Sequence, residues 1–139
     1  MNSEIAIQKA TAADAPSVAV LVGELLAEIM QAIEVQAFNF DFDETTARLA
    51  DFINREKYFV FVARNDSDTV IGFIALYESY ALYAEGAFGT IPELYVRPAY
   101  RANKLGLRLV AQAKSFGLSR GSGPVWKSRR HRCHSLIAP

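Results

Sequence analysis

The fold of this chain is decided by one stretch of sequence, Ile91-Pro-Glu-Leu-Tyr-Val-Arg-Pro-Ala-Tyr-Arg-Ala-Asn-Lys-Leu-Gly106. Residues 90–96 have the β-branched and aromatic content of a strand, and Arg97-Pro98 ends it. After a short polar loop, apolar residues recur at helical spacing up to about Ser119. The members of that helical face are Leu105, Leu109, Ala113 and Phe116. We therefore predict a strand, a tight loop and a helix in direct succession.

A junction of this kind is suited to binding an anion. The free backbone N–H groups and the positive end of the helix dipole point at one place, which favours phosphate. Arg101, Lys104 and Arg108 would add positive charge around that place. An ordinary strand-to-helix turn with solvated basic side chains explains the same pattern, and spacing alone does not choose between the two.

The segment from Tyr95 to Gly106 resembles the acetyl-CoA-binding signature of the GNAT superfamily of N-acetyltransferases. That signature reads Arg or Gln, two residues, Gly, one residue, then Gly or Ala. Arg101 and Gly106 match it, and Lys104 stands where the first Gly is usual. A side chain there makes a left-handed turn costly, so we expect cofactor binding that is weaker or altered in geometry. Alternatively, the Lys104 ammonium reaches a phosphate.

The resemblance, which covers about residues 4–120, implies an enzyme and a co-substrate. The enzyme would move an acetyl group from acetyl-CoA directly to a primary amine of a small molecule or a protein. The pantetheine arm would pair with the strand backbone at Leu94, Tyr95 and Val96. The pyrophosphate would rest on the backbone amides of the loop and the helix start. The residues concerned are Arg101, Ala102, Asn103, Lys104, Leu105 and Gly106.

The candidate general base is Glu93, next to the expected thioester channel. An aliphatic amine has a pKa of about 10, so it must lose a proton before it attacks. Glu93 could take that proton directly or through water; the alternative is a solvent-facing strand carboxylate. Pro92 lacks an N–H group, which indicates a sheet edge or a bulge at this point. A bulge would let the strand splay to admit the cofactor.

The sequence before this stretch predicts two helices and three strands. In chain order they are a strand at 4–9, a helix from a capping-box-like Thr11 to Ile33, a helix from a capping Asp43 to about Arg55, and a hairpin of strands at 58–63 and 69–77. The order is β-α-α-β-β-β-α. The fold class is therefore α+β, a GNAT-like, mostly antiparallel central sheet flanked by helices. The sequence does not predict the strand-helix-strand half that usually follows in the family.

Two loops are expected to recognise the acceptor amine, at residues 34–42 and 77–90. Their aromatic residues are plausible pocket walls, and Glu78 or Glu85 could hold a cation. The aromatic residues are Phe38, Phe40, Phe42, Tyr77, Tyr80 and Tyr83. Core packing and lid contacts are the alternative role for most of them.

The net charge of zero hides a division along the chain. Residues 1–96 hold all fifteen acids and five of the fifteen bases, whereas residues 97–139 hold ten bases and no acid. Such asymmetry indicates either an anionic partner for the basic part or two parts of one fold that neutralise each other. A nucleic-acid module is a third interpretation, but no recognised motif or interleaved aromatic residue supports it. The residues that suggest it are Lys127, Arg129, Arg130, His131 and Arg132.

Residues 121–139 depart from the family pattern, so we predict a 1–120 acetyltransferase core and an atypical basic tail. We hypothesise that a frameshift replaced and truncated the carboxyl-terminal part. A sheet ending at residues 90–96 would expose an edge. Either a short strand from Val125-Trp126 or a symmetric homodimer could cover it.

The composition limits the remaining possibilities. The 139 residues are 51% hydrophobic, enough for a packed core. The absence of a run of about 18 apolar residues argues against a membrane span. One cysteine, Cys133, and no secretory signal indicate a cytoplasmic protein. We expect no metal site, because the spacing of His131, Cys133 and His134 matches no strong pattern.

Overall fold

In the part of the chain that the computed structural model describes, residues 4–35, 39–82, 86–120 and 126–128, five strands form one sheet. The strands lie in chain order: β1 (Ala6–Lys9), β2 (Phe59–Arg64), β3 (Val70–Ala81), β4 (Gly86–Val96) and β5 (Trp126–Ser128). The first four pair antiparallel, and β5 pairs parallel to β4. The predicted α+β class with a mostly antiparallel sheet is confirmed.

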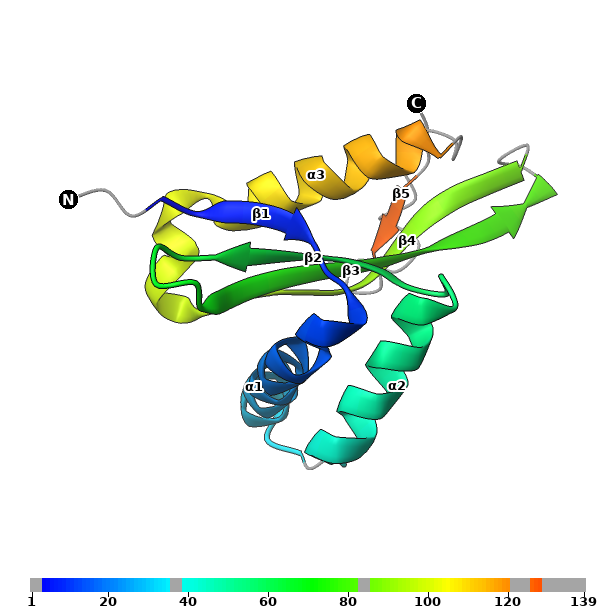
Figure 1. The fold of residues 1–139 in the computed structure, drawn as a ribbon. Helices are drawn as coiled ribbons and strands as arrows, with labels where there is room; N and C mark the ends of the chain where they lie inside the picture. Colours follow the sequence, from blue (N-terminus) through cyan, green and yellow to red (C-terminus); the bar gives the residue numbers. More distant parts are fainter. Residues whose placement is uncertain (1–3, 36–38, 83–85, 121–125, 129–139) are drawn as a thin grey trace.

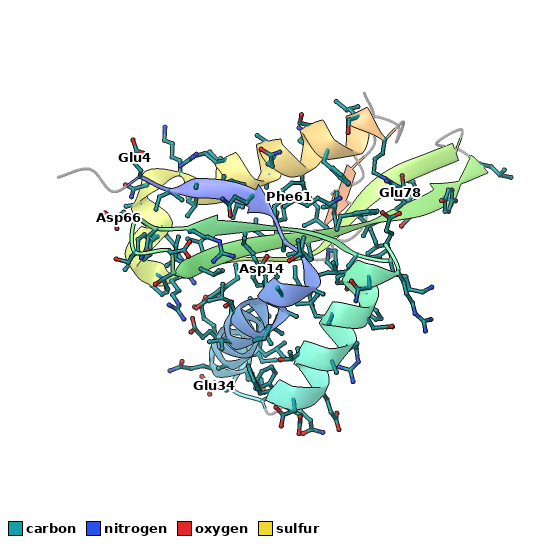
Figure 2. All side chains as sticks on the ribbon, viewed as in Figure 1. Glu4, Asp14, Glu34, Phe61, Asp66 and Glu78 are labelled. Carbon is teal, nitrogen blue, oxygen red and sulfur yellow. The ribbon has the colours of Figure 1, made fainter. Side chains whose placement is uncertain are left out.

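Helices cover both faces of the sheet (Figure 1). The helices α1 (Ala15–Ile33) and α2 (Phe42–Asn54) lie on one face, and α3 (Leu105–Ser119) lies on the other. The strand β2 is therefore buried on both sides, and its side chains alternate between two cores. Val60 and Val62 pack with α1, whereas Phe59 and Phe61 pack with α3. Figure 2 shows the labelled Phe61 between β2 and α3.

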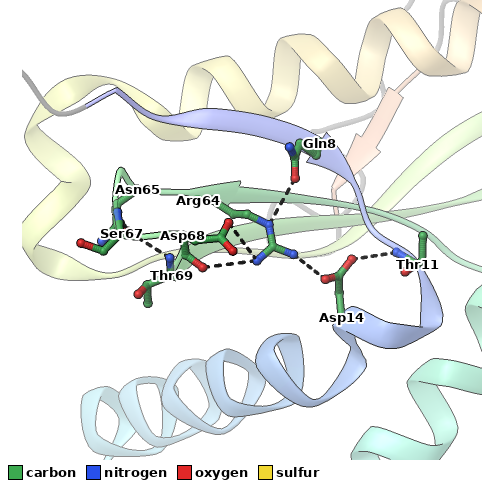
Figure 3. Close-up of polar contacts among 8 residues, drawn as sticks. All are labelled: Gln8, Thr11, Asp14, Arg64, Asn65, Ser67, Asp68 and Thr69. Carbon is green, nitrogen blue, oxygen red and sulfur yellow. Dashed lines mark hydrogen bonds and ion pairs between the residues drawn. The ribbon is translucent and has the colours of Figure 1, made fainter.

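The start of the first helical segment is fixed by local hydrogen bonds. The backbone N–H of Thr11 donates to Asp14 Oδ2 at 2.9 Å, across the short 3₁₀ helix η1 (Ala12–Asp14) that leads into α1. This confirms the capping arrangement predicted for Thr11 and Asp14. Arg64 of β2 forms an ion pair with Asp14 and donates from Nε to Gln8 Oε1 at 3.2 Å (Figure 3). These contacts hold the entry to α1 against the sheet.

The cap of α2 differs from the prediction. Asp41, in extended conformation, accepts a hydrogen bond from the backbone N–H of Glu44 at 2.8 Å, so it is the N-cap residue. Asp43, the predicted cap, lies inside the first turn. Both aspartates precede the apolar face, and only the backbone conformation separates a cap from a first-turn acid.

The hairpin of β3 and β4 is longer than predicted. The expected loop at 77–90 is wrong for most of its length, because pairing continues from Tyr77 opposite Thr90 to Ala81 opposite Gly86. The hydroxyls of Ser79 and Thr90 share a hydrogen bond of 2.8 Å across the two strands. Figure 1 shows this hairpin extending past the rest of the sheet.

The bulge predicted at Pro92 is present in β4. Ala75 lies opposite Glu93, but Tyr77 lies opposite Thr90, so β4 has one extra residue across from Leu76. The extra residue places Thr90 and Glu93 on the same face although they are three positions apart. The bonded pairs between β4 and β5 run only from Gly89 to Ile91, so they stop at this bulge.

The properties of α1 weaken the prediction, made from the composition, that the chain has no membrane span. Ala12–Ile33 has a mean hydropathy of 1.5 and is long and apolar enough, by length and composition, to cross a membrane. The exclusion from sequence was therefore too strong. In this fold the apolar stripe of α1 packs on the sheet, with Val18, Leu21 and Leu25 buried.

The strand β5 resolves one alternative left open for the tail. Trp126–Ser128 adds the short strand that Val125-Trp126 suggested, beside β4. The domain boundary at residue 120 and the frameshift hypothesis stay predictions. Lys127 lies in β5, whereas the other basic and possible metal-ligating residues of the tail, including Arg129, His131 and Cys133, lie outside the described residues.

Candidate active site

The junction between β4 and α3 is a 3₁₀ helix, η3 (Pro98–Asn103), followed directly by α3. The Tyr100 N–H donates to Arg97 O at 2.9 Å, and in a 3₁₀ helix each N–H group donates to a carbonyl three residues earlier. The amides from Tyr100 to Asn103 are therefore used within the chain. The first turn of α3 leaves its own amides without helical partners, at residues 105–107. Arg108 N–H already donates to Lys104 O at 3.2 Å.

This geometry limits the predicted phosphate site to fewer residues than the sequence indicated. Of the six residues named from the sequence, Arg101, Ala102 and Asn103 lie within η3, and Leu105 and Gly106 open α3. A Cβ atom added to Gly106 would meet nothing within 4 Å, so this side of the first turn is open. An anionic group can approach the amides there, at the positive end of a helix of 15 residues.

Lys104 has the left-handed conformation that its place in the signature implies. Its φ is 57° and its ψ is 29°, and it is the N-cap residue of α3. The expected cost of a side chain at this position is therefore real, about 1–2 kcal/mol for a residue other than Gly. The Lys104 side chain is exposed.

The outer edge of β4 supplies a second part of the site. The Arg97 N–H donates to Ile71 O at 2.9 Å, and hydrogen bonding alternates along an antiparallel pair. The backbone groups of Leu94 and Val96 therefore face away from β3, whereas those of Tyr95 face β3. Two of the three residues predicted to pair with a pantetheine arm present their backbone at the edge that β5 leaves uncovered.

Two carboxylates of α1 hold the arginines of this region. Glu24 accepts from Arg97 Nε at 3.1 Å and Arg97 Nη2 at 2.9 Å, and from the Tyr95 hydroxyl at 3.1 Å. Glu28 accepts from Arg101 Nη2 with both oxygens, at 3.0 and 2.8 Å. Arg101 Nε donates to the Val96 carbonyl at 2.7 Å. The guanidinium expected near a phosphate is thus bonded to protein acceptors.

These contacts perturb the titration of three groups. Burial and then the hydrogen bond to Glu24 raise the pKa of Tyr95. Hydrogen bonding to Glu24 raises the pKa of Arg97, and hydrogen bonding to Glu28 raises the pKa of Arg101. Tyr95 is therefore neutral, and both arginines are charged, across the physiological range.

Glu93 lies in β4 immediately after the bulge, half-buried, opposite Ala75. By strand alternation its side chain is on the face of Tyr95, the face covered by α1. Tyr77, two residues from Ala75 on β3, is a diagonal neighbour on that same face. A base at Glu93 would thus act beside the bulge, between the outer edge of β4 and the aromatic side chains around Tyr77.

An open cleft of about 410 Å³ starts at Tyr77. It is lined by Phe52, Glu56, Lys57, Tyr58, Phe59, Tyr77, Glu78 and Tyr80. The rings of Tyr58 and Tyr77 are stacked, with centroids 5.9 Å apart and planes at 10°. Phe52 packs on Tyr58 with a centroid distance of 5.1 Å. Glu78, labelled on the hairpin in Figure 2, pairs with Arg120 at 3.6 Å.

The residues predicted to line the acceptor pocket fall into three groups in the structure. Tyr77, Tyr80 and Glu78 line the cleft. Phe40 instead packs on α1, where its ring lies 2.8 Å from the position of a Cβ atom on Gly23, and Phe42 is the first residue of α2. Phe38, Tyr83 and Glu85 lie outside the described residues.

Two cleft residues, Phe52 and Tyr58, were missed as site residues. The sequence places Phe52 on the inner face of its helix and Tyr58 at a strand start; in the structure Phe52 packs on Tyr58, and β2 begins one residue later, at Phe59. Phe52 contacts Tyr58, and Tyr58 stacks on Tyr77 of β3, so residues from three different segments of the chain meet in the fold. No local signal in the sequence could have shown that contact.

The charge division has a structural explanation within the fold. Arg97, Arg101 and Arg120 of the basic part pair with Glu24, Glu28 and Glu78 of the acidic part. For these bases mutual neutralisation, rather than an anionic partner, is the outcome. Across the described ranges, no group of three or more His, Cys, Asp or Glu side chains could hold a metal ion.

Comparisons with known proteins identify a family and several structures with a similar fold. The model of the acetyltransferase (GNAT) family matches residues 26–134. No curated protein matches the sequence significantly. A putative acetyltransferase from Arthrobacter sp. FB24 is 27% identical, with a TM-score of 0.70 over 88% of this chain and 72% of that one.

Two more distant structures share the fold. A protein described as a predicted acetyltransferase, from Clostridium acetobutylicum and with acetyl-CoA, is 12% identical, with a TM-score of 0.76 over 98% of this chain and 92% of that one. An aminoglycoside acetyltransferase from an uncultured soil metagenomic sample, in complex with sisomicin, is 18% identical, with a TM-score of 0.66 over 89% and 74% of the two chains.

Proposed function

The chain belongs to the GNAT family of acetyltransferases, and from this premise we propose that it moves the acetyl group of acetyl-CoA to a primary amine. It is an acyltransferase that uses an acyl-CoA. One observation carries the proposal: beyond Ile91 no described strand pairs with the outer edge of β4, and after η3 the chain opens α3 with an accessible first turn. A thioester carrier has a polar, extended arm and a diphosphate, and these two features match the two parts of the site.

The residues present fit such a carrier. The N–H and carbonyl of Leu94 and the N–H of Val96 can hydrogen bond with the amide groups of a pantetheine arm, as they would with an added strand, while the Val96 carbonyl accepts from Arg101. The amides at residues 105–107 can bind the diphosphate, because they lie at a helix N-terminus and Gly106 leaves them accessible. Lys104, in its left-handed conformation, is exposed beside them and adds one positive charge.

The acceptor amine would approach from the face of Glu93. Glu93 would take a proton from the arriving ammonium group, directly or through water, and the neutral nitrogen would then attack the thioester carbonyl. The C–S bond breaks, and the leaving CoA thiolate takes up the second proton of the nitrogen. The acceptor amine on one side of β4 and the thioester on the other would meet at the bulge, where β4 has an extra residue beside Pro92.

The cleft around Tyr58 and Tyr77 is the proposed acceptor site. The tyrosine faces attract an ammonium group, and Glu56 in the cleft lining adds negative charge, whereas the charge of Glu78 is paired with Arg120. Lys57 on the same rim disfavours a densely charged polycation. The proposed acceptor is therefore a small molecule or protein segment with one or two amines and an apolar body.

The proposal is tested by incubating the protein with acetyl-CoA and a panel of primary amines while free thiol is measured. Thiol release that depends on an amine, and an acetylated product of matching mass, are expected. Release that no amine increases would contradict the proposal.

The alternative is a relative that binds CoA or itself without transferring acetyl. The observation that favours it is the side chain at the left-handed Lys104 position. Binding of CoA without amine-dependent thiol release would select this alternative. A cytoplasmic location and a homodimer stay predictions from the sequence.

A further inference from the structure

Side chains of α1 form ion pairs with arginines at the end of β4 and in η3, the segment that leads into α3. Glu24 and Glu28 are one helical turn apart on α1, and Arg97 and Arg101 have the same spacing beyond β4. Each carboxylate binds its arginine with two hydrogen bonds, between 2.8 and 3.1 Å long. Arg97 meets Glu24 as a fork, with Nε and Nη2 donating to separate oxygens, whereas Arg101 donates to both oxygens of Glu28 from Nη2 alone. Hydrogen bonds between charged groups of this kind are stronger than bonds between neutral groups. We call this set of four side chains the α1 clamp.

Arg101 links three parts of the molecule. Its Nε donates to the Val96 carbonyl at 2.7 Å, and its Nη2 donates to Glu28. The Val96 carbonyl faces the uncovered edge of β4, while the Arg101 backbone is part of η3. One planar guanidinium therefore fixes the last residue of the strand relative to the turn that leads into α3.

A second anchor acts on the other side of η3. Asn65 Nδ2 donates to the Tyr100 hydroxyl at 3.0 Å. Asn65 is itself held, because its Oδ1 accepts from the backbone N–H of Ser67 at 2.9 Å and of Thr69 at 3.0 Å (Figure 3). The turn is thus tied both to α1 and to the loop before β3.

We propose that Glu28, acting through Arg101, is a positioning residue for acyl-CoA, and that Glu24 supports it through Arg97 and Tyr95. The inference rests on the proposed function, since it assigns the α1 clamp to the same cofactor site. A ligand that binds the β4 edge and the α3 amides at once needs a fixed distance between them. The α1 clamp fixes that distance before the ligand arrives, so less ordering is left for the binding step.

A simpler view makes the opposite prediction. If Arg101 acted as a positive charge on the diphosphate, Glu28 would compete with the ligand for it. Removing the Glu28 charge would then free the guanidinium and strengthen binding. With the α1 clamp, removing that charge loosens the turn and weakens binding. The sign of the effect of Glu28→Gln therefore separates the two views.

The experiment measures KM for acetyl-CoA and kcat separately, together with the dissociation constant of CoA by calorimetry. For Glu28→Gln we expect both constants for the cofactor to rise about fivefold to tenfold, with kcat changed less than about twofold. Arg101→Lys should act in the same direction, because an ammonium keeps the charge but cannot bond to Glu28 and Val96 O in one fixed fork.

The matched control is Asp51→Asn, which breaks an ion pair of 2.9 Å with Arg55 on α2, away from the site. It should leave both cofactor constants unchanged. Glu24→Gln serves as a second variant if Glu28→Gln folds poorly, and thermal unfolding of each variant shows whether the fold is kept.

The outcomes separate the two proposals. Wild-type binding of CoA with equal or tighter binding by Glu28→Gln would overturn the positioning role and leave the proposed function standing. A wild-type-like KM for Arg101→Lys would also overturn it, because charge alone would then suffice. No binding of CoA to the wild-type protein would overturn both.

Discussion

Replacing Lys104 by glycine should stabilise the protein. Lys104 has a φ of 57°, a conformation that costs a residue with a Cβ about 1–2 kcal/mol. Glycine removes that cost but adds unfolded-chain freedom worth about 0.5–1 kcal/mol. The net gain is about 0.5–1 kcal/mol, which for 139 residues corresponds to a rise in Tm of about 2–3 °C. Calorimetric or spectroscopic thermal unfolding of Lys104→Gly against wild type measures it.

Two control variants separate backbone strain from loss of the lysine charge. Lys104→Ala removes the exposed side chain and keeps the Cβ, so its Tm should not rise. Glu56 has a φ of 56° beyond the end of α2, so Glu56→Gly should raise Tm by about as much as Lys104→Gly does. A lower Tm for Lys104→Gly, or equal gains for Lys104→Gly and Lys104→Ala, would refute the reasoning from the left-handed turn.

Three further predictions follow from the site. Glu93→Gln should lower kcat by about 10²–10⁴-fold near neutral pH, and the deficit should shrink toward pH 10 as the amine loses its own proton; a loss that is independent of pH would contradict a role as base. Gly106→Val should leave Tm nearly unchanged, because a Cβ there meets nothing, but should raise KM for acetyl-CoA, so equal KM values would argue against the α3 site. The raised pKa of Tyr95 means that the folded state favours the neutral phenol, so its contribution is complete below pH 10 and is lost as pH rises through the folded pKa. Denaturant unfolding of Tyr95→Phe should therefore show a smaller loss of stability above pH 10 than wild type.

The parts of the fold that depend on local sequence could be predicted. The strand ending at Val96, the turn and the helix from Leu105 to Ser119 are set by neighbouring residues. The bulge followed from one missing N–H group, at Pro92. In each case the signal lies within a few residues of the feature it determines.

Features that depend on pairing between distant strands were harder to predict. The tyrosines and glycines of residues 77–90 are compatible with a loop, and only the register with Thr90 and its neighbours makes them a ladder. The cap of α2 differs by two residues from the prediction because both Asp41 and Asp43 can accept the same kind of bond.

The α1 clamp could not be derived from the sequence. Glu28 and Arg101 are 73 residues apart, and nothing local to either indicates the other. The division of charge along the chain gave one hint, since it allowed acidic and basic parts to neutralise each other. The same pattern was equally compatible with an anionic partner, so a contact in three dimensions was needed to choose.

The central claim is that an acyl-CoA binds along the β4 edge and at the first turn of α3. The most direct test is titration of ¹⁵N-labelled protein with CoA while backbone amide resonances are followed. The account predicts that the largest shifts fall on Leu94, Val96 and residues 105–107, with smaller ones on β1. Saturable binding that leaves those amides unchanged, or shifts confined to another face of the sheet, would contradict it.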